Sequence, residues 1–583
     1  MNKKQKKKSP SASSSEPKGK TNPKQNFSSQ KKLRIIPLGG QEEVGRNMNV
    51  FEYNQDIVII DMGMQFPEEE MPGIDYIIPN IKYLKGQEKN IRGVIFTHGH
   101  LDHIGAAPIL LEKLGYPPVI GRPLTLAMIK SRLEDYKKGS SKRLKTIEIK
   151  NIKQKIKLAS FEASFFPVDH STMDAMGIVL KTPQANIIHP GDWTYEENPV
   201  KRKSINYHHL SRLKKPTVLM LESLASTSNR PRVPEKTMYQ NIEKLIKEAS
   251  GRIILATFSS QIERIKNIIP LAEKFGRKVA FDGYSMRLNM EIAKKLGYIK
   301  FKKSNIIPIK KINKYPDNKV LIFCTGAQGE PRAVLSRMVE GSHKYVQIKK
   351  KDTVIFSSSV IPGNERSIQK LKDSLYRLSD NVIHNDIMDV HSSGHATAQD
   401  MIKVVRQIKP TYFMPVYAHY YFLKEAEKLI ARDNFAKKNI FVLENGQTLE
   451  FKNKKPRKIK KKVPTNYIMV DGLGVGDVGE IVLRDRNVLA KDGMVVIILK
   501  VDDKNKKIIG EPDIISRGFV YMKKSNKLIK DTKQKVKDIF NSAPRRKTNY
   551  WDPLKSKIRD DIGQYLFNKT ERRPMILPVL IEV

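Results

Sequence analysis

The residues best suited to chemistry in this 583-residue chain lie in one short segment, Thr97-His98-Gly99-His100-Leu101-Asp102-His103. Its three imidazoles and one carboxylate are the ligand types that zinc and related divalent ions prefer. The segment follows an apolar run, Val94–Phe96, that we expect to form a strand, and a helix is expected to begin near Ile104. A loop at a strand end can direct alternate side chains toward one point. The spacing therefore predicts a metal centre.

Two more candidate ligands each follow an apolar run. His170 lies in Phe166-Pro167-Val168-Asp169-His170-Ser171, and Asp192 ends His189-Pro190-Gly191-Asp192. Alone, each would be read as a turn or capping residue. Beside a segment already rich in ligands, both become candidates for the same centre.

The elements that must position these residues are short apolar runs separated by Gly, Pro and Asn turns, which predict strands. From about residue 210 the pattern becomes strand–helix–strand, with helices expected to begin at Pro234 and after Ser260. This alternation indicates a parallel α/β unit.

The chain carries a formal charge of +46. Residues 1–32 hold ten lysines and one glutamate and are expected to be a disordered basic arm, and residues Lys452–Lys462 add +8. A basic body favours a polyanionic partner, although a lysine-rich solvated surface explains charge alone equally well. The single cysteine, Cys324, allows no intrachain disulfide, and no apolar run approaches the ~18 residues of a spanning helix. We therefore expect a cytoplasmic protein with no membrane partner.

The H-x-H-x-D-H motif, with Ile60-Asp61-Met62-Gly63 before it and His170 and Asp192 after it, resembles the metallo-β-lactamase superfamily, and the helix-rich insertion resembles its β-CASP nucleases. From about residue 33 to Val583 the chain is similar to the bacterial ribonuclease J family. Further matching segments are Gly39-Gly40-Gln41-Glu42-Glu43-Val44-Gly45, Phe66-Pro67-Glu68, Thr325-Gly326-Ala327-Gln328-Gly329-Glu330-Pro331, Ser357-Ser358-Ser359, His391-Ser392-Ser393-Gly394-His395, Arg517-Gly518-Phe519-Val520-Tyr521 and Arg572-Arg573-Pro574-Met575-Ile576-Leu577-Pro578.

The resemblance implies an α/β fold: a metallo-β-lactamase αββα sandwich with an inserted β-CASP α/β domain and a small C-terminal α+β domain. The expected boundaries are a basic arm (1–32), the sandwich in two parts (33–210 and 366–451), the β-CASP domain (211–365), a basic linker (452–464) and the C-terminal domain (465–583).

The resemblance also implies two divalent ions per subunit, zinc in the first place with manganese or magnesium as alternatives. His98, His100 and His170 would hold one ion, Asp102 and His103 the second, and Asp192 would lie between them. Such an ion pair supports phosphodiester hydrolysis without a covalent intermediate.

Catalytic and substrate-binding roles follow from the same resemblance. Glu222 would donate a proton, and His395 would handle a proton or contact the scissile phosphate. Expected RNA contacts are Ser260, Gln261 and Ile262 at the 5′ phosphate end, and His391, Ser392, Ser393, Gly394 and His395 at the phosphates. Helix capping by Ser259 or Ser260, and a capping or core role for His391, are the structural alternatives.

One position departs from the family pattern. Where the family has its last histidine ligand, this chain reads Pro415-Val416-Tyr417-Ala418-His419. A phenol with a pKa near ~10 is a poor ligand at neutral pH. Either Tyr417 coordinates as a phenolate, or His419 replaces it, or Asp102, His103 and Asp192 hold the second ion weakly. Asp471, together with the residues after Pro72, aligns with a structural calcium site of some relatives.

The implied function is a metal-dependent ribonuclease with 5′-to-3′ exonuclease and endonuclease activity in RNA maturation and decay, with preference for a 5′-monophosphate. The alternatives are a catalytically weakened member that binds RNA or a partner subunit, and a DNA-processing β-CASP nuclease. A homodimer or larger oligomer, and membership of an RNA-degradation complex, are expected by the same resemblance.

Overall fold

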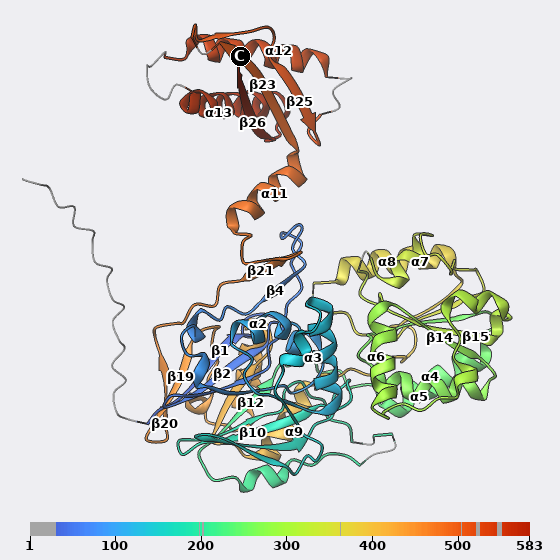
Figure 1. Cartoon of the computed structure of the whole chain (residues 1–583). Coiled ribbons are helices and arrows are strands. Elements are labelled where there is room, and N and C mark those ends of the chain that lie inside the picture. The colour runs from blue at the N-terminus through green and yellow to red at the C-terminus, as the bar shows by residue number, and fades with distance from the viewer. Residues whose placement is uncertain are drawn as a thin grey trace, which may run out of the picture.

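The computed structural model describes residues 31–583 except 198, 201–202, 331, 362, 503, 521–524 and 545–550. Residues 1–30, most of the expected basic arm, lie outside the described part of the chain. Figure 1 shows a two-sheet sandwich, an α/β domain beside it and a C-terminal domain joined through helix α11.

The sandwich consists of an eight-stranded and a six-stranded sheet. The first has the order β20 (Lys455–Ile459), β19 (Thr448–Lys452), β1 (Leu33–Gly39), β2 (Met48–Tyr53), β3 (Asp56–Ile60), β5 (Ile91–Ile95), β6 (Val119–Gly121) and β7 (Thr146–Glu148). The second has the order β18 (Tyr412–Val416), β12 (Thr217–Glu222), β11 (Asn186–His189), β10 (Met176–Lys181), β9 (Phe161–Pro167) and β8 (Lys155–Leu158).

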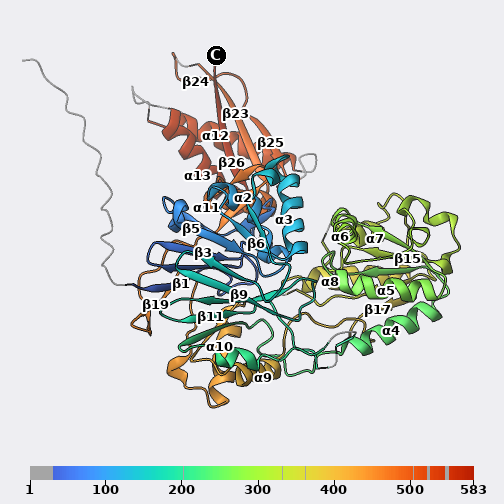
Figure 2. The same cartoon turned by 60° about the horizontal axis from the view of Figure 1, so that its bottom comes forward.

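Strand β1 shows how the sequence builds the layers, because successive side chains of a strand point to opposite faces. Leu33 and Ile35 pack into the core between the sheets, whereas Ile36 and Leu38 pack into the core under the outer helices. Helices α1 (Leu101–Ile104), α2 (Ala107–Lys113) and α3 (Pro123–Tyr136) belong to one side, and α9 (Ala398–Ile408) and α10 (Tyr420–Arg432) to the other. Figure 2 shows α2 and α3 above the sheets and α9 and α10 below them. The predicted αββα sandwich is confirmed.

The inserted domain is a five-stranded parallel sheet in the order β14 (Lys278–Asp282), β15 (Val320–Cys324), β13 (Ile253–Ala256), β16 (Thr353–Phe356) and β17 (Asn381–Ile383). Its central strand β13 is fully buried, as expected for a parallel strand covered on both faces. One face packs against α4 (Glu235–Glu248), α5 (Ile262–Lys274) and α6 (Tyr284–Lys295), and the other against α7 (Val334–Val339) and α8 (Glu365–Leu378).

The C-terminal domain follows helix α11 (Glu480–Asp492). Strand β23 (Met494–Asp502) pairs with β24 (Lys507–Ile508), β25 (Asp513–Arg517) and β26 (Met575–Glu582), and its core includes α12 (Asn526–Ser542) and α13 (Trp551–Thr570). A separate small sheet joins β4 (Tyr76–Ile78), β21 (Ile468–Asp471) and β22 (Gly474–Val475).

The strand pairings differ from three of the predicted domain boundaries. Strand β12 pairs with β11 and β18 of the sandwich, so the insertion begins after Glu222, and it extends through β17 rather than ending at residue 365. Residues 455–459 of the expected linker form the edge strand β20, antiparallel to β19. Strand β21 pairs with β4 of the body, so the C-terminal domain begins near α11 rather than at residue 465. Charge composition alone could not reveal these pairings, because they depend on partners distant in sequence.

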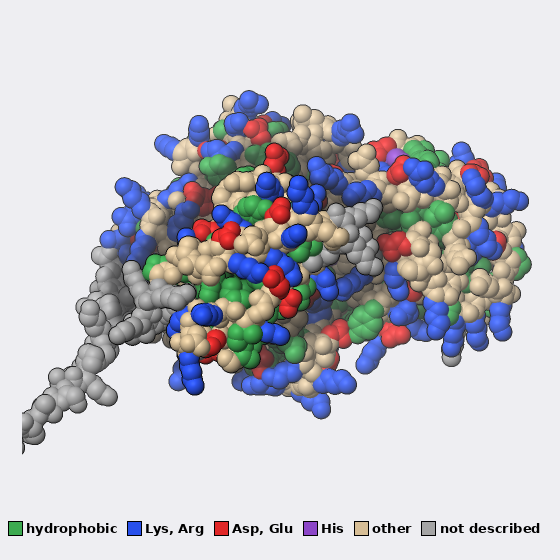
Figure 3. Space-filling view, turned by 90° about the horizontal axis from the view of Figure 1, so that it is seen from above, with side chains coloured by type: hydrophobic (Ala, Val, Ile, Leu, Met, Phe, Trp, Pro, Cys, Tyr) green, Lys and Arg blue, Asp and Glu red, His purple; other side chains and the backbone are tan. Residues whose placement is uncertain are grey.

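Lysine and arginine side chains cover the face of the molecule seen in Figure 3. The eight basic residues from Lys452 to Lys462 are all exposed, in and around the β19–β20 hairpin. We call residues 452–462 the basic hairpin. None of the described helices combines the length and apolar character needed to cross a membrane.

Candidate metal centre and active site

Four sandwich strands end at the candidate site. Strand β5 ends at Ile95, just before the Thr97–His103 segment, and β11 ends at His189, three residues before Asp192. Strand β12 ends at Glu222, and β18 ends at Val416, directly before Tyr417. Because β11, β12 and β18 are parallel neighbours, their carboxyl ends meet at one edge of the sheet.

The structure brings all six predicted metal ligands together. Nε2 of His98 and Nε2 of His170 lie 3.1 and 3.0 Å from Nδ1 of His100. Nε2 of His103 lies 3.2 and 3.4 Å from carboxylate oxygens of Asp192 and Asp102. The ligand atoms form two groups that share Asp192, with all distances inside a group within 4.8 Å: His98, His100, His170 and Asp192, and Asp102, His103 and Asp192.

Hydrogen bonds from the far side of two rings orient them toward the centre. Nδ1 of His103 donates to Asp61 Oδ2 at 2.8 Å, and Nδ1 of His170 donates to the Gly394 carbonyl at 2.8 Å. Each bond places the ring proton on Nδ1 and leaves Nε2 free to bind a cation. The sequence analysis did not single out Asp61, although its position in Ile60-Asp61-Met62-Gly63 was a signal.

The protonation states suit a cation. Burial lowers the pKa values of His98 and His170 well below the usual range and that of His100 to about 4, so these rings are neutral. Burial opposes ionisation of Asp192, but His103 and the other nearby imidazoles lower its pKa well below the usual range. Neutral imidazoles beside an ionised carboxylate are the forms that bind metals.

The residues present therefore fit divalent ions. Three imidazole nitrogens converge within hydrogen-bond distance of one another, and a cation between them would remove the repulsion of their lone pairs. A set of nitrogen and carboxylate donors without thiolate suits zinc or manganese.

Tyr417 lies at the edge of this centre, with its ring centroid 5.3 Å from that of His103. Its hydroxyl oxygen lies 2.9 Å from both Asn49 Nδ2 and His189 Nε2. His189 accepts the Gly191 N–H at Nδ1, so it carries its own proton on Nε2 and donates to the phenol oxygen. Burial raises the pKa of Tyr417 well above its usual value, which favours the neutral phenol. Asn49 and His189 were not foreseen, although His189 opens the His189–Asp192 motif.

His419 takes no part in either ligand group among the described residues. It precedes α10 and stacks against Tyr421, with 6.3 Å between ring centroids and 10° between ring planes. Of the three alternatives for the missing ligand, this geometry favours a second ion held by Asp102, His103 and Asp192.

Glu222 and His395 form a charged pair beside the ligands, with 3.5 Å between Glu222 Oε2 and His395 Nδ1. Burial opposes the charged form of His395, but the carboxylates of Glu222, Asp192 and Asp102 together raise its pKa to about 9. Burial raises the pKa of Glu222. The His395 side chain is 28% exposed and that of Glu222 only 2%, so His395 is the member of the pair that can meet a substrate.

The expected RNA-contact segments flank this pair. Helix α5 begins at Ile262 with Gln261 as its N-cap, and no side chain caps it, so capping by Ser259 or Ser260 is not observed. His391 is 3% exposed, and its Nε2 has no hydrogen-bond partner.

Asp471 lies away from the metal centre and already has a cationic partner. Arg486 donates to Asp471 Oδ2 at 2.5 Å and to the Pro72 carbonyl at 3.2 Å. A guanidinium thus binds the two oxygens considered for calcium, and the geometry does not favour a calcium ion there.

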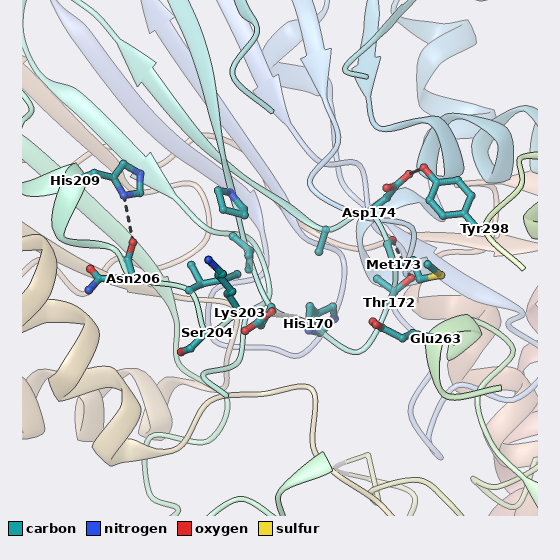
Figure 4. A pocket seen from close by; sticks show the side chains of 15 residues that line it. His170, Thr172, Met173, Asp174, Lys203, Ser204, Asn206, His209, Glu263 and Tyr298 are labelled. Atoms are coloured by element: carbon teal, nitrogen blue, oxygen red, sulfur yellow. Dashed lines mark hydrogen bonds between the residues drawn. The ribbon is translucent and has the colours of Figure 1, made fainter. Parts of the chain in front are cut away.

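A cavity of about 610 Å³ opens beside His170, between the sandwich and the inserted domain. Figure 4 shows side chains from both domains around it, with His170 and Asp174 from the sandwich and Glu263 and Tyr298 from the insertion. The cavity gives the metal centre a route for a substrate larger than a single phosphate.

Sequence models of three families match the chain. The metallo-beta-lactamase superfamily matches residues 42–222, the beta-CASP domain of ribonuclease J matches residues 250–375, and the ribonuclease J C-terminal domain matches residues 481–583.

Relatives of known name match over nearly the whole chain. Ribonuclease J2 of Bacillus subtilis (strain 168) is 36% identical over 553 residues, covering 94% of this chain and 99% of the relative. Ribonuclease J 2 of Staphylococcus aureus (strain MRSA252) is 33% identical over 555 residues, covering 95% and 99%. A solved structure of a protein of unknown function from Enterococcus faecalis V583 aligns with a TM-score of 0.49 and 14% identity, covering 72% of this chain and 100% of that one.

Proposed function

The chain belongs to the ribonuclease J family of metallo-β-lactamase and β-CASP ribonucleases, and we propose that it hydrolyses RNA as a two-metal 5′-to-3′ exonuclease and endonuclease in RNA maturation and decay. The convergence of six ligand side chains at the carboxyl edge of the sandwich sheets carries this proposal. A preference for 5′-monophosphate RNA and a cytoplasmic place of action, alone or in an RNA-degradation complex, belong to the same proposal.

The ligand groups divide the metal-binding work. His98, His100, His170 and Asp192 would hold one ion, while Asp102, His103 and the shared Asp192 would hold the other, with zinc first and manganese or magnesium as alternatives. When bound, such ions supply a hydroxide nucleophile and stabilise charge on the phosphate.

The protein's own proton donor is His395. With its pKa raised to about 9, its imidazole is charged at neutral pH and can protonate the departing 3′ oxygen. Glu222 is too buried to contact substrate, and it stabilises that charge from behind. His391–His395 and the start of α5 would contact the RNA phosphates.

The test is cleavage of a labelled 5′-monophosphate RNA in Mn²⁺, Mg²⁺ or Zn²⁺ by the wild type and by an Asp102→Ala/His103→Ala variant. Substitution of His208, an exposed histidine outside the centre, provides the matched control. Cleavage by wild type and control but not by the double variant supports the proposal. Cleavage by all three proteins would refute the assignment of the centre.

A second candidate function is favoured by Tyr417. With only three side chains for the second ion, the chain would be a weakened member of the family that binds RNA or a catalytic partner subunit. If the wild type leaves RNA intact with every metal while Tyr417→His cleaves it, this second function replaces the first.

DNA processing is the remaining alternative. Matched RNA and DNA oligonucleotides decide it, because equal cleavage of both would contradict a ribonuclease-specific role.

We further propose a homodimer or larger oligomer that assembles through the C-terminal domain. Apolar side chains on β25 and β26 support this, since Ile515, Leu577 and Ile581 are each more than 40% exposed. Light scattering of the full chain and of a chain ending at Gly479 tests it, because an unchanged oligomer in the shorter chain would refute the proposal.

A further inference from the structure

Arg264 connects the two segments expected to contact RNA. It lies in the first turn of α5, directly after Gln261 and Ile262, and its guanidinium reaches the His391 loop. NH1 lies 2.6 Å from His391 Nδ1 and donates to the Ser357 carbonyl at 2.7 Å, while NH2 donates to the Ser392 carbonyl at 2.8 Å.

The charge of Arg264 has no counter-ion. The side chain is buried, and it takes part in none of the ion pairs between described residues, whereas buried Arg252 is paired with Asp352 at 2.6 Å. Burial lowers the pKa of Arg264 to about 10, so the guanidinium remains charged at neutral pH. An unpaired buried cation is costly, and a bound anion offsets that cost.

The contact with Arg264 also determines the tautomer of His391. A guanidinium can only donate hydrogen bonds, so Nδ1 of His391 must accept, and the proton of the neutral ring lies on Nε2. Nε2 is buried and has no partner among the described residues. A buried N–H without an acceptor is costly, and a phosphate oxygen would satisfy it.

We propose that Arg264 is a positioning residue, which holds His391 as an Nε2–H donor and places that donor at a fixed distance from the α5 N-terminus to receive an RNA phosphate. This inference rests on the proposed function, because it takes RNA as the ligand. It adds a residue that acts through His391 rather than by touching the substrate.

Two other buried arginines provide matched controls. Arg232 donates to the Ser393 carbonyl at 2.7 Å and so holds the same loop, but it is paired with Glu196 and has no printed bond to His391. Arg277 donates to backbone carbonyls, including that of Gly251 at 2.9 Å, and makes no contact with the loop. Substituting Arg232 tests loop support alone, and substituting Arg277 tests the loss of a buried arginine alone.

The experiment is a double-mutant cycle on RNA affinity. The full chain, with metal removed by chelator, is titrated into a 3′-labelled single-stranded RNA at an ionic strength that suppresses nonspecific binding. Fluorescence anisotropy gives Kd for the wild type, Arg264→Met, His391→Gln and the double variant. We expect Arg264→Met to raise Kd about tenfold, as loss of a charge-assisted hydrogen bond does, and to add almost nothing in the His391→Gln background.

The controls distinguish positioning from loop support. Arg277→Met should leave Kd unchanged, and Arg232→Met should act equally with and without His391. Full additivity of Arg264→Met and His391→Gln would overturn the inference, because Arg264 would then act on folding alone.

Running the cycle with 5′-monophosphate and 5′-hydroxyl RNA of one sequence identifies the phosphate. An effect confined to the 5′-monophosphate RNA assigns the terminal phosphate, and an equal effect on both assigns an internal one. Coupling without cleavage in any metal would refute the proposed ribonuclease activity and leave the inference intact, whereas cleavage without coupling would do the reverse.

Discussion

Replacing Tyr417 by histidine should create a stronger second metal site while weakening the metal-free protein. The phenol ring lies against His103, so an imidazole at this position would face the group formed by Asp102, His103 and Asp192. The same substitution removes the oxygen that accepts hydrogen bonds from Asn49 and His189.

The two effects have opposite signs and can be estimated. Asn49 and His189 are fully buried, and each donor left without an acceptor costs about 1–3 kcal/mol, so the metal-free variant should lose about 2–6 kcal/mol of unfolding free energy. A fourth ligand should lower the Kd of the second ion by about tenfold or more, since the loss of even an outer-shell partner costs about 10–100-fold in affinity. At a metal concentration about 100 times Kd, binding restores about 2.7 kcal/mol.

The assay combines metal titration with thermal unfolding, in chelator and in excess Zn²⁺ or Mn²⁺. The Tyr417→His variant should unfold at a lower temperature than the wild type in chelator and recover most of the difference with metal. Tyr417→Phe is the matched control, because it loses the same oxygen without gaining a ligand and should show no recovery. Equal second-site affinity in wild type and Tyr417→His would refute the view that the second ion lacks a ligand here.

Three further predictions concern proton transfer, loop packing and charge. His395 acts while protonated, so kcat/KM should be retained below its pKa of about 9 and lost as pH rises through it. Glu222→Gln removes a carboxylate that raises this pKa, so the alkaline limb should move to lower pH, and an unmoved limb would contradict the pairing. Gly394→Ala would place a Cβ 3.2 Å from His170 Cε1, and we expect about tenfold weaker metal binding by titration, with Gly479→Ala, whose Cβ meets nothing within 4 Å, unchanged. Neutralising exposed lysines of the basic hairpin should reduce the salt dependence of RNA binding by about 0.7 in slope per lost phosphate contact, whereas an unchanged slope would exclude the hairpin from the RNA path; the triple variant is Lys455→Gln, Lys460→Gln and Lys461→Gln.

Much of the ligand set could be predicted because its members are crowded in sequence. His98, His100, Asp102 and His103 lie within six positions after a buried strand, a spacing that local geometry alone directs to one place. His170 and Asp192 also follow strand ends, and parallel strands end at a common edge. The αββα sandwich and the parallel insertion followed from the resemblance and from the apolar periodicity of single strands, which each element carries within itself.

The tertiary structure decided every feature that depends on partners distant along the chain. No local pattern reveals that Asn49 and His189 donate to the Tyr417 oxygen, because these residues come from three different strand ends. The same holds for Arg264, which reads as one charged position of an amphipathic helix until its guanidinium is seen at His391. Strand β20 was read as a linker because its lysines are polar in sequence, while an edge strand needs only one hydrogen-bonded neighbour and can expose most of its side chains. Composition and spacing therefore determined which chemistry is available, whereas hydrogen-bonded partners and burial determined the protonation state and role of each group.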